Sequence, residues 1–192
     1  IKKFGLPFTK SPHCTRELKN YPINSYIKSL GINKKDYKIA IGIRADEDRR
    51  ANLKNKQNFI FPLLDTNTDK QDVLDWWEEQ KFDLEIPEHF GNCVWCWKKS
   101  YKKLMTVMHE EPSAFDFPEK MEKLYSRNGA VANKLQKDIK IFRGWKTVQD
   151  IRDMMHEGFE KYIDLHHLHI TDGCSESCEP FLDEQPVRII DD

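Results

Sequence analysis

Several features that would indicate a membrane, secreted or fibrous protein are missing from this chain of 192 residues. No stretch approaches the ~18 apolar residues that a membrane helix needs, and the first residues do not have the form of a signal peptide. There are no internal repeats and no low-complexity segments. The net charge of -1 argues against a general nucleic-acid binder, although a local basic patch remains open. We therefore expect a globular cytoplasmic protein without a membrane partner.

The chain does contain five cysteines, four of them in two close pairs. The pairs are Cys93-Val-Trp-Cys96 and Cys174-Ser-Glu-Ser-Cys178, and Cys14 stands alone near the start. Thiols at positions i and i+3 can turn toward one point, as a metal ion or an iron–sulfur cluster requires. An odd number of cysteines without an export signal favours ligands or redox centres over disulfides. The cysteines are therefore the first candidates for a functional site.

The hydrophobic pattern indicates an α/β domain that is followed by helices. Nearly continuous apolar runs at 37–43 and 58–64 are typical of short buried strands, and Pro62 places the second at an edge or a strand end. Helices are predicted over 22–30, 69–80, 101–110, 118–137 and 147–162, and the form Thr-x-x-Gln at 68–71 predicts a capping box for the second. We expect Trp76, Trp77 and Phe82 to belong to the core.

Two basic segments, 13–19 and 44–50, belong near the edge of the predicted sheet. In open α/β sheets, ligands bind beyond the carboxyl ends of the strands, and 44–50 follows the first strand directly. Arginine offers a bidentate fork and lysine a point charge, and both suit phosphate or sulfate. The alternative is a solvated surface whose charges pair locally with Glu17, Asp46, Glu47 and Asp48.

Four segments in a fixed order resemble motifs of the phosphoadenosine-phosphosulfate (PAPS) and adenylyl-sulfate reductases, which belong to the adenine-nucleotide alpha-hydrolase, or PP-loop, superfamily. Cys14-Thr-Arg-Glu-Leu-Lys19-Asn-Tyr-Pro22 is similar to Cys-Cys-x-x-Arg-Lys-x-x-Pro, and Gly42-Ile-Arg44-Ala-Asp-Glu47 is similar to Gly-Leu-Arg-Arg-x-Glu. The stretch 61–73 resembles the family's Pro-Leu and Trp-Thr-x-x-Asp-Val motifs, and Cys93–Cys96 falls where cluster-bearing members carry Cys-x-x-Cys. The resemblance covers roughly residues 5–100.

The resemblance implies a fold and a division of the chain. Residues 1–100 would be the C-terminal part of a PAPS-reductase-like α/β domain that lacks its N-terminal part, and 101–192 a mostly helical extension with a Cys-bearing tail. The family's Gly-rich phosphate loop does not occur in this sequence, so it would lie on a separate or missing N-terminal segment. The tandem Cys-Cys of the cluster-binding members is replaced by Cys14-Thr15.

The resemblance also implies site residues. Lys19 and Arg44 would hold the anionic group of an adenine nucleotide or sulfonucleotide, with Arg16 and Arg50 as helpers. A 4Fe–4S cluster would be held by a set of thiols, with apolar walls supplied by Trp95, Trp97 and Phe90; the thiols are Cys14, Cys93, Cys96 and one of Cys174 or Cys178. Structural zinc on the same cysteines and buried thiols without a metal are the alternatives.

Two classes of function follow from these expectations. The first is an iron–sulfur enzyme that acts on an adenylated or sulfated nucleotide, as an oxidoreductase or a sulfurtransferase. The second is a non-enzymatic, zinc-stapled, degenerate PP-loop module that binds nucleic acid or a partner protein.

Overall fold

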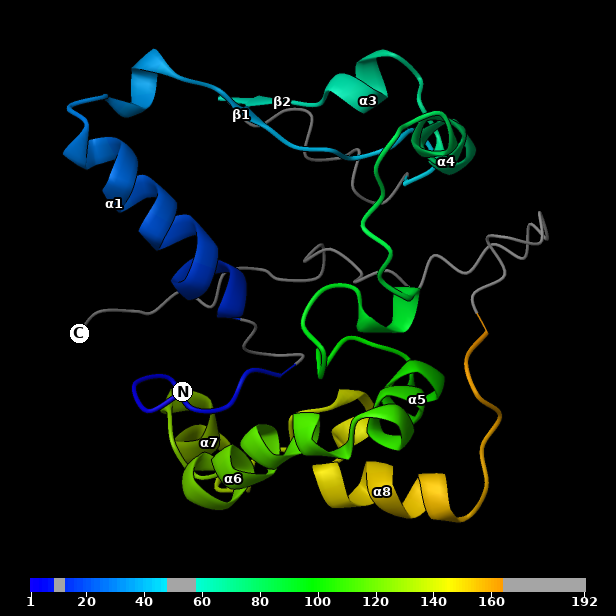
Figure 1. The fold of residues 1–192 in the computed structure, drawn as a ribbon. Helices are drawn as coiled ribbons and strands as arrows, with labels where there is room; N and C mark the ends of the chain where they lie inside the picture. The colour runs from blue at the N-terminus through cyan, green and yellow to red at the C-terminus, as the bar shows by residue number, and fades with distance from the viewer. Residues whose placement is uncertain (9–12, 48–57, 164–192) are drawn as a thin grey trace. The chain divides into compact units, whose positions relative to one another are not determined.

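A computed structural model describes residues 1–8, 13–47 and 58–163 of the chain (Figure 1). The described residues form two compact units. Unit 1 contains the N-terminal segment up to Glu17 together with residues 86–163, and unit 2 contains residues 18–47 and 58–85. Unit 1 therefore brings together two parts of the sequence that are far apart.

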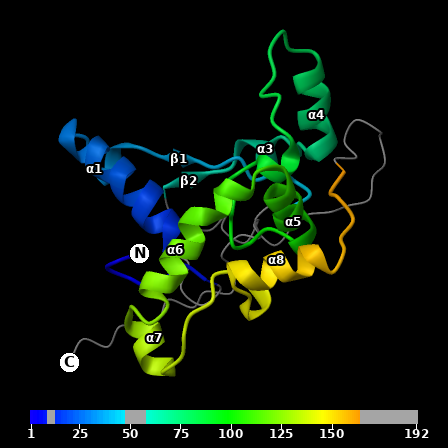
Figure 2. The ribbon, with the colours of Figure 1, turned by 60° about the horizontal axis from the view of Figure 1, so that its bottom comes forward.

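Unit 1 is built from helices. Its longer helices are α5 (Tyr101–Glu110), α6 (Asp116–Tyr125) and α8 (Val148–His156), and α5 and α8 lie side by side in both ribbon views (Figures 1 and 2). Shorter helical segments connect them, namely η4 (Glu88–Phe90), η5 (Pro112–Phe115), α7 (Ala130–Leu135) and η6 (Arg143–Trp145).

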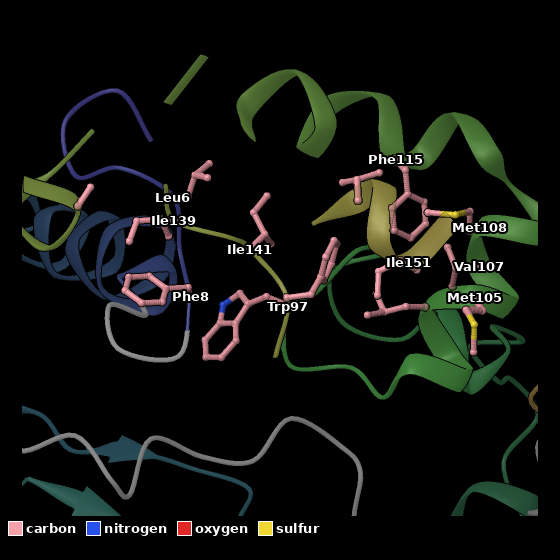
Figure 3. Close-up of a cluster of buried hydrophobic side chains, with 14 residues drawn as sticks. Leu6, Phe8, Trp97, Met105, Val107, Met108, Phe115, Ile139, Ile141 and Ile151 are labelled. Atoms are coloured by element: carbon pink, nitrogen blue, oxygen red, sulfur yellow. The ribbon is translucent and has the colours of Figure 1, made fainter. Parts of the chain in front are cut away.

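The core of unit 1 is a continuous cluster of buried apolar side chains (Figure 3). Helix α5 contributes Leu104 and Val107, and α8 contributes Ile151. The N-terminal segment joins the same core through Leu6 and Phe8, both of which are buried. Burial of this apolar surface is the main stabilising contribution that the structure shows for unit 1.

Two helices of unit 1 begin at side-chain caps that the sequence encodes locally. The Ser100 hydroxyl accepts a hydrogen bond from the Lys103 amide at the start of α5 (3.3 Å). At the start of α8, the Asp150 amide donates to the Thr147 hydroxyl (3.0 Å) and the Thr147 amide donates to the Asp150 carboxylate (2.7 Å), which is a capping box. These bonds satisfy amides that have no partner within the helix.

Unit 2 has a small parallel sheet. Strands β1 (Ile39–Ala40) and β2 (Phe59–Ile60) pair in the register Ile39↔Phe59 and Ala40↔Ile60. The unit also contains α1 (Tyr21–Ser29), η2 (Lys34–Asp36), α3 (Pro62–Asp65) and α4 (Lys70–Glu78), and η1 (Arg16–Asn20) leads into α1. Ile43 and Phe61, which follow the two strands, are the buried apolar side chains described in this unit.

The predicted helices 22–30 and 101–110 are confirmed by α1 and α5, and the helices predicted at 69–80 and 147–162 are confirmed with earlier ends. The single helix predicted over 118–137 is wrong, because the chain breaks between α6 and α7 at Gly129, which has φ +95. A Cβ at Gly129 would collide with the Phe4 carbonyl, so the break is also the place where the N-terminal segment packs.

Three other predictions need correction. The strands predicted at 37–43 and 58–64 are only two residues long each, because the chain turns after the Ile41 amide has donated to the Ile60 carbonyl (3.0 Å) and Pro62 begins a helix. The capping box of α4 is formed by Asp69 and Asp72 instead of residues 68 and 71. 

The expected core position of the α4 aromatic side chains is wrong as well. Trp76 and Phe82 are 52% and 64% exposed, and Trp77 packs edge-on against both (4.8 and 5.6 Å between ring centroids). The rings cover one another, and no described residue buries them as a group.

The compact units divide the chain differently from the predicted boundary at residue 100. Residues 1–17 pack with the helical part because Leu6 and Phe8 belong to its core. In the part of the chain that the structure describes, none of the helices combines the length and apolar character of a membrane span.

Candidate functional site: a thiol cluster and an arginine loop

Cys14 lies beside the Cys93–Cys96 loop within unit 1, although the two are distant in sequence. Trp97 and Cys93 are both close enough to Cys14 to influence the pKa of its thiol. The pKa of the Cys14 thiol is raised, chiefly by burial; the indole of Trp97 acts to lower it and the charge of Cys93 to raise it. The tertiary structure thus brings Cys14 to the predicted Cys-x-x-Cys segment.

Backbone hydrogen bonds and the Lys99 side chain hold the Cys93–Cys96 loop in a turn. The Cys96 amide donates to the Cys93 carbonyl (2.9 Å), and the Lys99 amide donates to the Cys96 carbonyl (3.0 Å). The buried Lys99 ammonium donates to the carbonyls of Val94 (3.0 Å) and His89. A buried ammonium needs such partners, and here they fix the backbone on both sides of Cys93.

The aromatic residues of and near this loop differ in how deeply they are buried. Trp97 is 7% exposed and belongs to the core cluster, and Figure 3 shows its indole ring among those side chains. Trp95 and Phe90 are half-buried, and Trp95 contacts Phe117 (5.7 Å between ring centroids). Cys93 itself is exposed, whereas Cys14 and Cys96 are half-buried.

The donor set suits a soft metal ion, because three of the predicted thiols belong to one unit. Within residues 1–8, 13–47 and 58–163, however, no three His, Cys, Asp or Glu side chains are arranged to bind a metal ion. The remaining candidate ligands, Cys174 and Cys178, lie outside the described residues. A complete ligand set would thus need a donor beyond those described and another arrangement of the described thiols.

The Arg44 loop follows the carboxyl end of β1 in unit 2. Its backbone is tied to the stretch after β2, because the Ala45 amide donates to the Thr68 carbonyl (2.8 Å). The Arg44 amide donates to the Glu47 carboxylate (3.1 Å). Gly42 precedes the loop and Ile43 is buried, so the loop is anchored at its start. The predicted location, after a strand of a parallel sheet, is thus confirmed.

The Arg44 side chain already has an acidic partner. Its guanidinium donates two hydrogen bonds to Asp46, from Nε to Oδ1 (2.9 Å) and from Nη2 to Oδ2 (3.0 Å). This bidentate pair lowers the pKa of Asp46 and raises that of Arg44. A phosphate or sulfate would have to displace the Asp46 carboxylate from the Arg44 guanidinium, or bind the edge of the guanidinium that Asp46 does not contact.

The other predicted anion-binding residues are not gathered into a site by the described structure. The Arg16 Nε donates to Glu17 (2.8 Å), and its guanidinium lies over the Phe4 ring (5.1 Å). Lys19 is exposed on η1, and Arg50 lies outside the described residues. The local pairing that the sequence left open as an alternative is therefore present for both Arg16 and Arg44.

A polar network that the sequence analysis did not identify anchors residues 160–162 to unit 1. The buried Lys103 ammonium contacts Glu88 (2.8 Å) and lies over the Tyr162 ring (4.7 Å), and the Tyr162 hydroxyl donates to Glu88. Glu110 contacts both His89 (2.6 Å) and Lys161 (2.5 Å). The sequence gives no local signal for this network, because Lys99 lies before α5, Lys103 lies within it, and their partners come from other segments.

Comparison with known proteins finds a relative in a bacteriophage. The chain is 36% identical over 186 residues to the protein named "Uncharacterized nin region protein ORF290" of Escherichia phage lambda. The match covers 94% of this chain and 62% of the phage protein, so the chain spans less than two thirds of that relative. No family model and no solved structure matches the chain.

Proposed function

We propose that this chain is part of a PAPS-reductase-like protein that carries a 4Fe–4S cluster and acts on an adenylated or sulfated nucleotide. The activity would be a reduction or a sulfur transfer in a reducing, cytoplasmic setting. The observation that best supports the proposal is the position of Cys14, which belongs to the same compact unit as the Cys93–Cys96 turn and is close enough to Cys93 for the charge of Cys93 to act on its thiol. The fold of the whole protein would be an α/β PP-loop domain whose missing part lies on another segment.

In this proposal the thiols hold the cluster and the basic residues bind the substrate. Cys14, Cys93 and Cys96 would be joined by one of Cys174 or Cys178, and the bound cluster would relay electrons to the substrate or polarise it. Arg44 and Lys19 would bind the sulfate or phosphate, with Arg16 and Arg50 as helpers. Because Asp46 occupies the Arg44 fork, substrate binding would exchange one bidentate anion for another.

The metal content of anaerobically purified protein is the first test. About four iron atoms and four acid-labile sulfides per chain, with brown absorption, are expected for the proposed cluster. One zinc per chain without sulfide would contradict the cluster and favour the second candidate below. Cys93→Ser and Cys96→Ser should both abolish metal uptake, whereas substitution of the exposed Ser113, which lies on η5 and away from the thiols in sequence, is the control.

Binding of adenosine phosphosulfate and of ATP tests the substrate half of the proposal separately. Arg44→Ala and Lys19→Ala should each weaken binding at least ~10-fold, because a charge-assisted hydrogen bond contributes about 1.5–3 kcal/mol. Asp46→Ala should strengthen binding, because it frees the Arg44 fork. Unchanged affinity in both Arg44→Ala and Asp46→Ala would remove Arg44 from the site.

The second candidate is a zinc-stapled, degenerate PP-loop module that binds nucleic acid or a partner protein without catalysis. The ion pairs Arg16–Glu17 (2.8 Å) and Arg44–Asp46 (2.9 Å) favour it, because they leave the predicted anion-binding arginines neutralised by their own neighbours. It predicts one zinc per chain and no change of nucleotide affinity in Asp46→Ala.

A further inference from the structure

A tight turn at residues 143–146 of unit 1 places a large aromatic side chain in an unusual backbone conformation. The Phe142 and Lys146 amides each donate to the carbonyl of the other residue (3.0 and 3.3 Å), so the chain reverses direction between them. Gly144 and Trp145 both have positive φ, at +64 and +60. Turns with two such residues favour glycine and asparagine, because the Cβ of other residues comes too close to the backbone. A bulky residue held in this conformation is a reason to look for a function at the turn.

Contacts with other parts of unit 1 hold the turn and the Trp145 ring in place. The Tyr101 hydroxyl donates to the Arg143 carbonyl (2.7 Å), and a Cβ on Gly144 would lie 2.3 Å from that hydroxyl. The Trp145 ring contacts the buried Phe8 ring edge-on, with 5.8 Å between ring centroids, and is still 37% exposed. Trp145 therefore combines a fixed position with a part of its ring that is open to solvent.

Cationic side chains from two distant segments meet at this turn. The Arg143 guanidinium donates to the Lys98 carbonyl (2.5 Å), which joins the turn to the segment before α5. Lys146 ends the turn, and both it and Arg143 are half-buried. The ion pairs found within the described part of the chain involve neither Arg143 nor Lys146. The positive charges beside Trp145 are thus not neutralised by a described carboxylate.

The sequence around the turn is locally basic, although the whole chain has a net charge of -1. Residues 134–146 contain five basic residues and one acidic residue, Asp138, which pairs with Arg127 (2.5 Å). Lys140 is paired with Asp150 (3.1 Å). A local excess of positive charge attracts a polyanion. Single-stranded nucleic acid matches both features of the turn, because it offers phosphates to the cations and open base faces to an aromatic ring. An acidic peptide of Asp and Glu would offer the charge alone.

We infer that the turn at residues 143–146, together with Lys98, is a binding surface for single-stranded nucleic acid. Trp145 stacks on a base, and the cationic side chains of Arg143, Lys146 and Lys98 contact the neighbouring phosphates. The inference does not rest on the proposed function, because it uses neither the thiols nor the Arg44 loop. A duplex should bind more weakly than a single strand, because its base faces are covered by stacking.

Binding is measured with the full chain by fluorescence anisotropy, with a labelled oligothymidylate of about 20 nucleotides, which exceeds the usual site size of such surfaces. Trp145→Asn should weaken binding at least ~10-fold through the loss of base stacking, and asparagine tolerates the positive φ of this position. The matched control is Trp76→Asn, at a tryptophan of unit 2 that is 52% exposed, and it should bind as the wild type does. A wild-type chain that does not bind, or equal affinity in wild type and Trp145→Asn, would overturn the inference.

The phosphate contacts are tested by the dependence of affinity on salt. Lys146→Gln should weaken binding and reduce the slope of log K against log salt by about 0.7, the value expected for one phosphate of a single strand. Lys123→Gln is the control, because Lys123 is an exposed lysine of the same unit whose charge is paired with Glu119 (2.7 Å). The same slope in Lys146→Gln and in wild type would contradict the placement of nucleic acid at this turn.

Polyglutamate of similar charge separates nucleic acid from an acidic protein partner. It should bind more weakly than oligothymidylate and should not respond to Trp145→Asn, because it has no ring to stack. Equal affinity for the two polyanions would refute nucleic-acid recognition and indicate an acidic partner. If Trp145→Asn does not fold, ultraviolet cross-linking of the wild-type complex decides the question. Oligothymidylate attached to the peptide that contains Trp145 supports the inference, and attachment only to other peptides would overturn it.

Discussion

Unit 1 and unit 2 differ in how well their apolar side chains are covered. Unit 1 buries a continuous cluster, which includes Leu104 and Phe115 with no exposed area. In unit 2 the described core consists of Ile43 and Phe61, whereas large apolar side chains of α1 and α4 are exposed. Parallel strands are normally covered on both faces and belong to larger sheets. The three described cysteines therefore lie in the better packed unit, and the Arg44 loop lies in the unit whose described part has the smaller core.

Removal of a large aromatic side chain should give the largest difference between the units. Phe115→Ala should lower the free energy of unfolding by about 4 kcal/mol, because it leaves a cavity in the core. The matched variant Phe82→Ala, at a side chain 64% exposed, should change it by less than about 0.5 kcal/mol. Urea unfolding followed by circular dichroism measures both. Comparable losses in the two variants would mean that the Phe82 ring is covered in solution.

Glycine substitutions should give the next largest difference. Gly129 in unit 1 and Gly31 in unit 2 both have positive φ, at +95 and +75. Gly129→Ala should lower the free energy of unfolding by roughly 2–3 kcal/mol, because the new Cβ would collide with the Phe4 carbonyl. Gly31→Ala should lower it by only about 1 kcal/mol, because nothing lies within 4 Å of the added Cβ. A smaller loss at Gly129 than at Gly31, in thermal unfolding, would contradict the packing of the N-terminal segment.

The two capping boxes test whether the units unfold independently. Thr147→Ala at α8 should reduce stability by about 1 kcal/mol, and amide hydrogen exchange should quicken throughout the α5 and α8 core. Asp69→Ala removes the equivalent cap of α4 and should quicken exchange in α4 only. If Asp69→Ala also quickens exchange in α5, the units unfold as one.

The smallest effect is expected from Glu110, which binds Lys161 and His89 in unit 1. Hydrogen bonds from Lys161 and His89 hold its pKa below the ordinary 4.5. A carboxylate with a depressed folded-state pKa stabilises the protein above its unfolded-state pKa, and this stabilisation is lost as the pH falls through the lower folded-state value. Glu110→Gln should therefore flatten the loss of stability below about pH 4.5, measured as unfolding midpoints from pH 7 to pH 3. A wild-type slope in Glu110→Gln would mean that these contacts do not form.

The local patterns of the sequence predicted several elements well. The helices 22–30 and 101–110 have their own apolar spacing and start signals, and α1 and α5 follow them closely. The position of the Arg44 loop after β1 was predictable for the same reason, since a short apolar run followed by a polar segment marks a strand end. The break at Gly129 was not anticipated, because its cause is contact with the Phe4 carbonyl from the other end of the chain.

The candidate site was also predicted from the sequence only in part. The spacing Cys93-Val-Trp-Cys96 indicated a turn with two neighbouring thiols, and the backbone bond from Cys96 to Cys93 forms such a turn. The burial of Lys99 and Lys103 was missed, because each depends on partners that are not neighbours in sequence. The pairing of Arg44 with Asp46 was left open by the sequence, since a loop arginine can meet either a local carboxylate or a ligand.

The sequence by itself determined the helices with strong local periodicity, the caps, and the supply of soft sulfur donors. These depend on side chains within a few positions of one another, where geometry is set by the backbone. Only the tertiary structure decided that Cys14 belongs to the same compact unit as Cys93 and Cys96, and that the α4 aromatics stay exposed. Such meetings depend on which apolar surfaces bury one another, and burial of Leu6 and Phe8 with the helices of unit 1 is what carries Cys14 to its place.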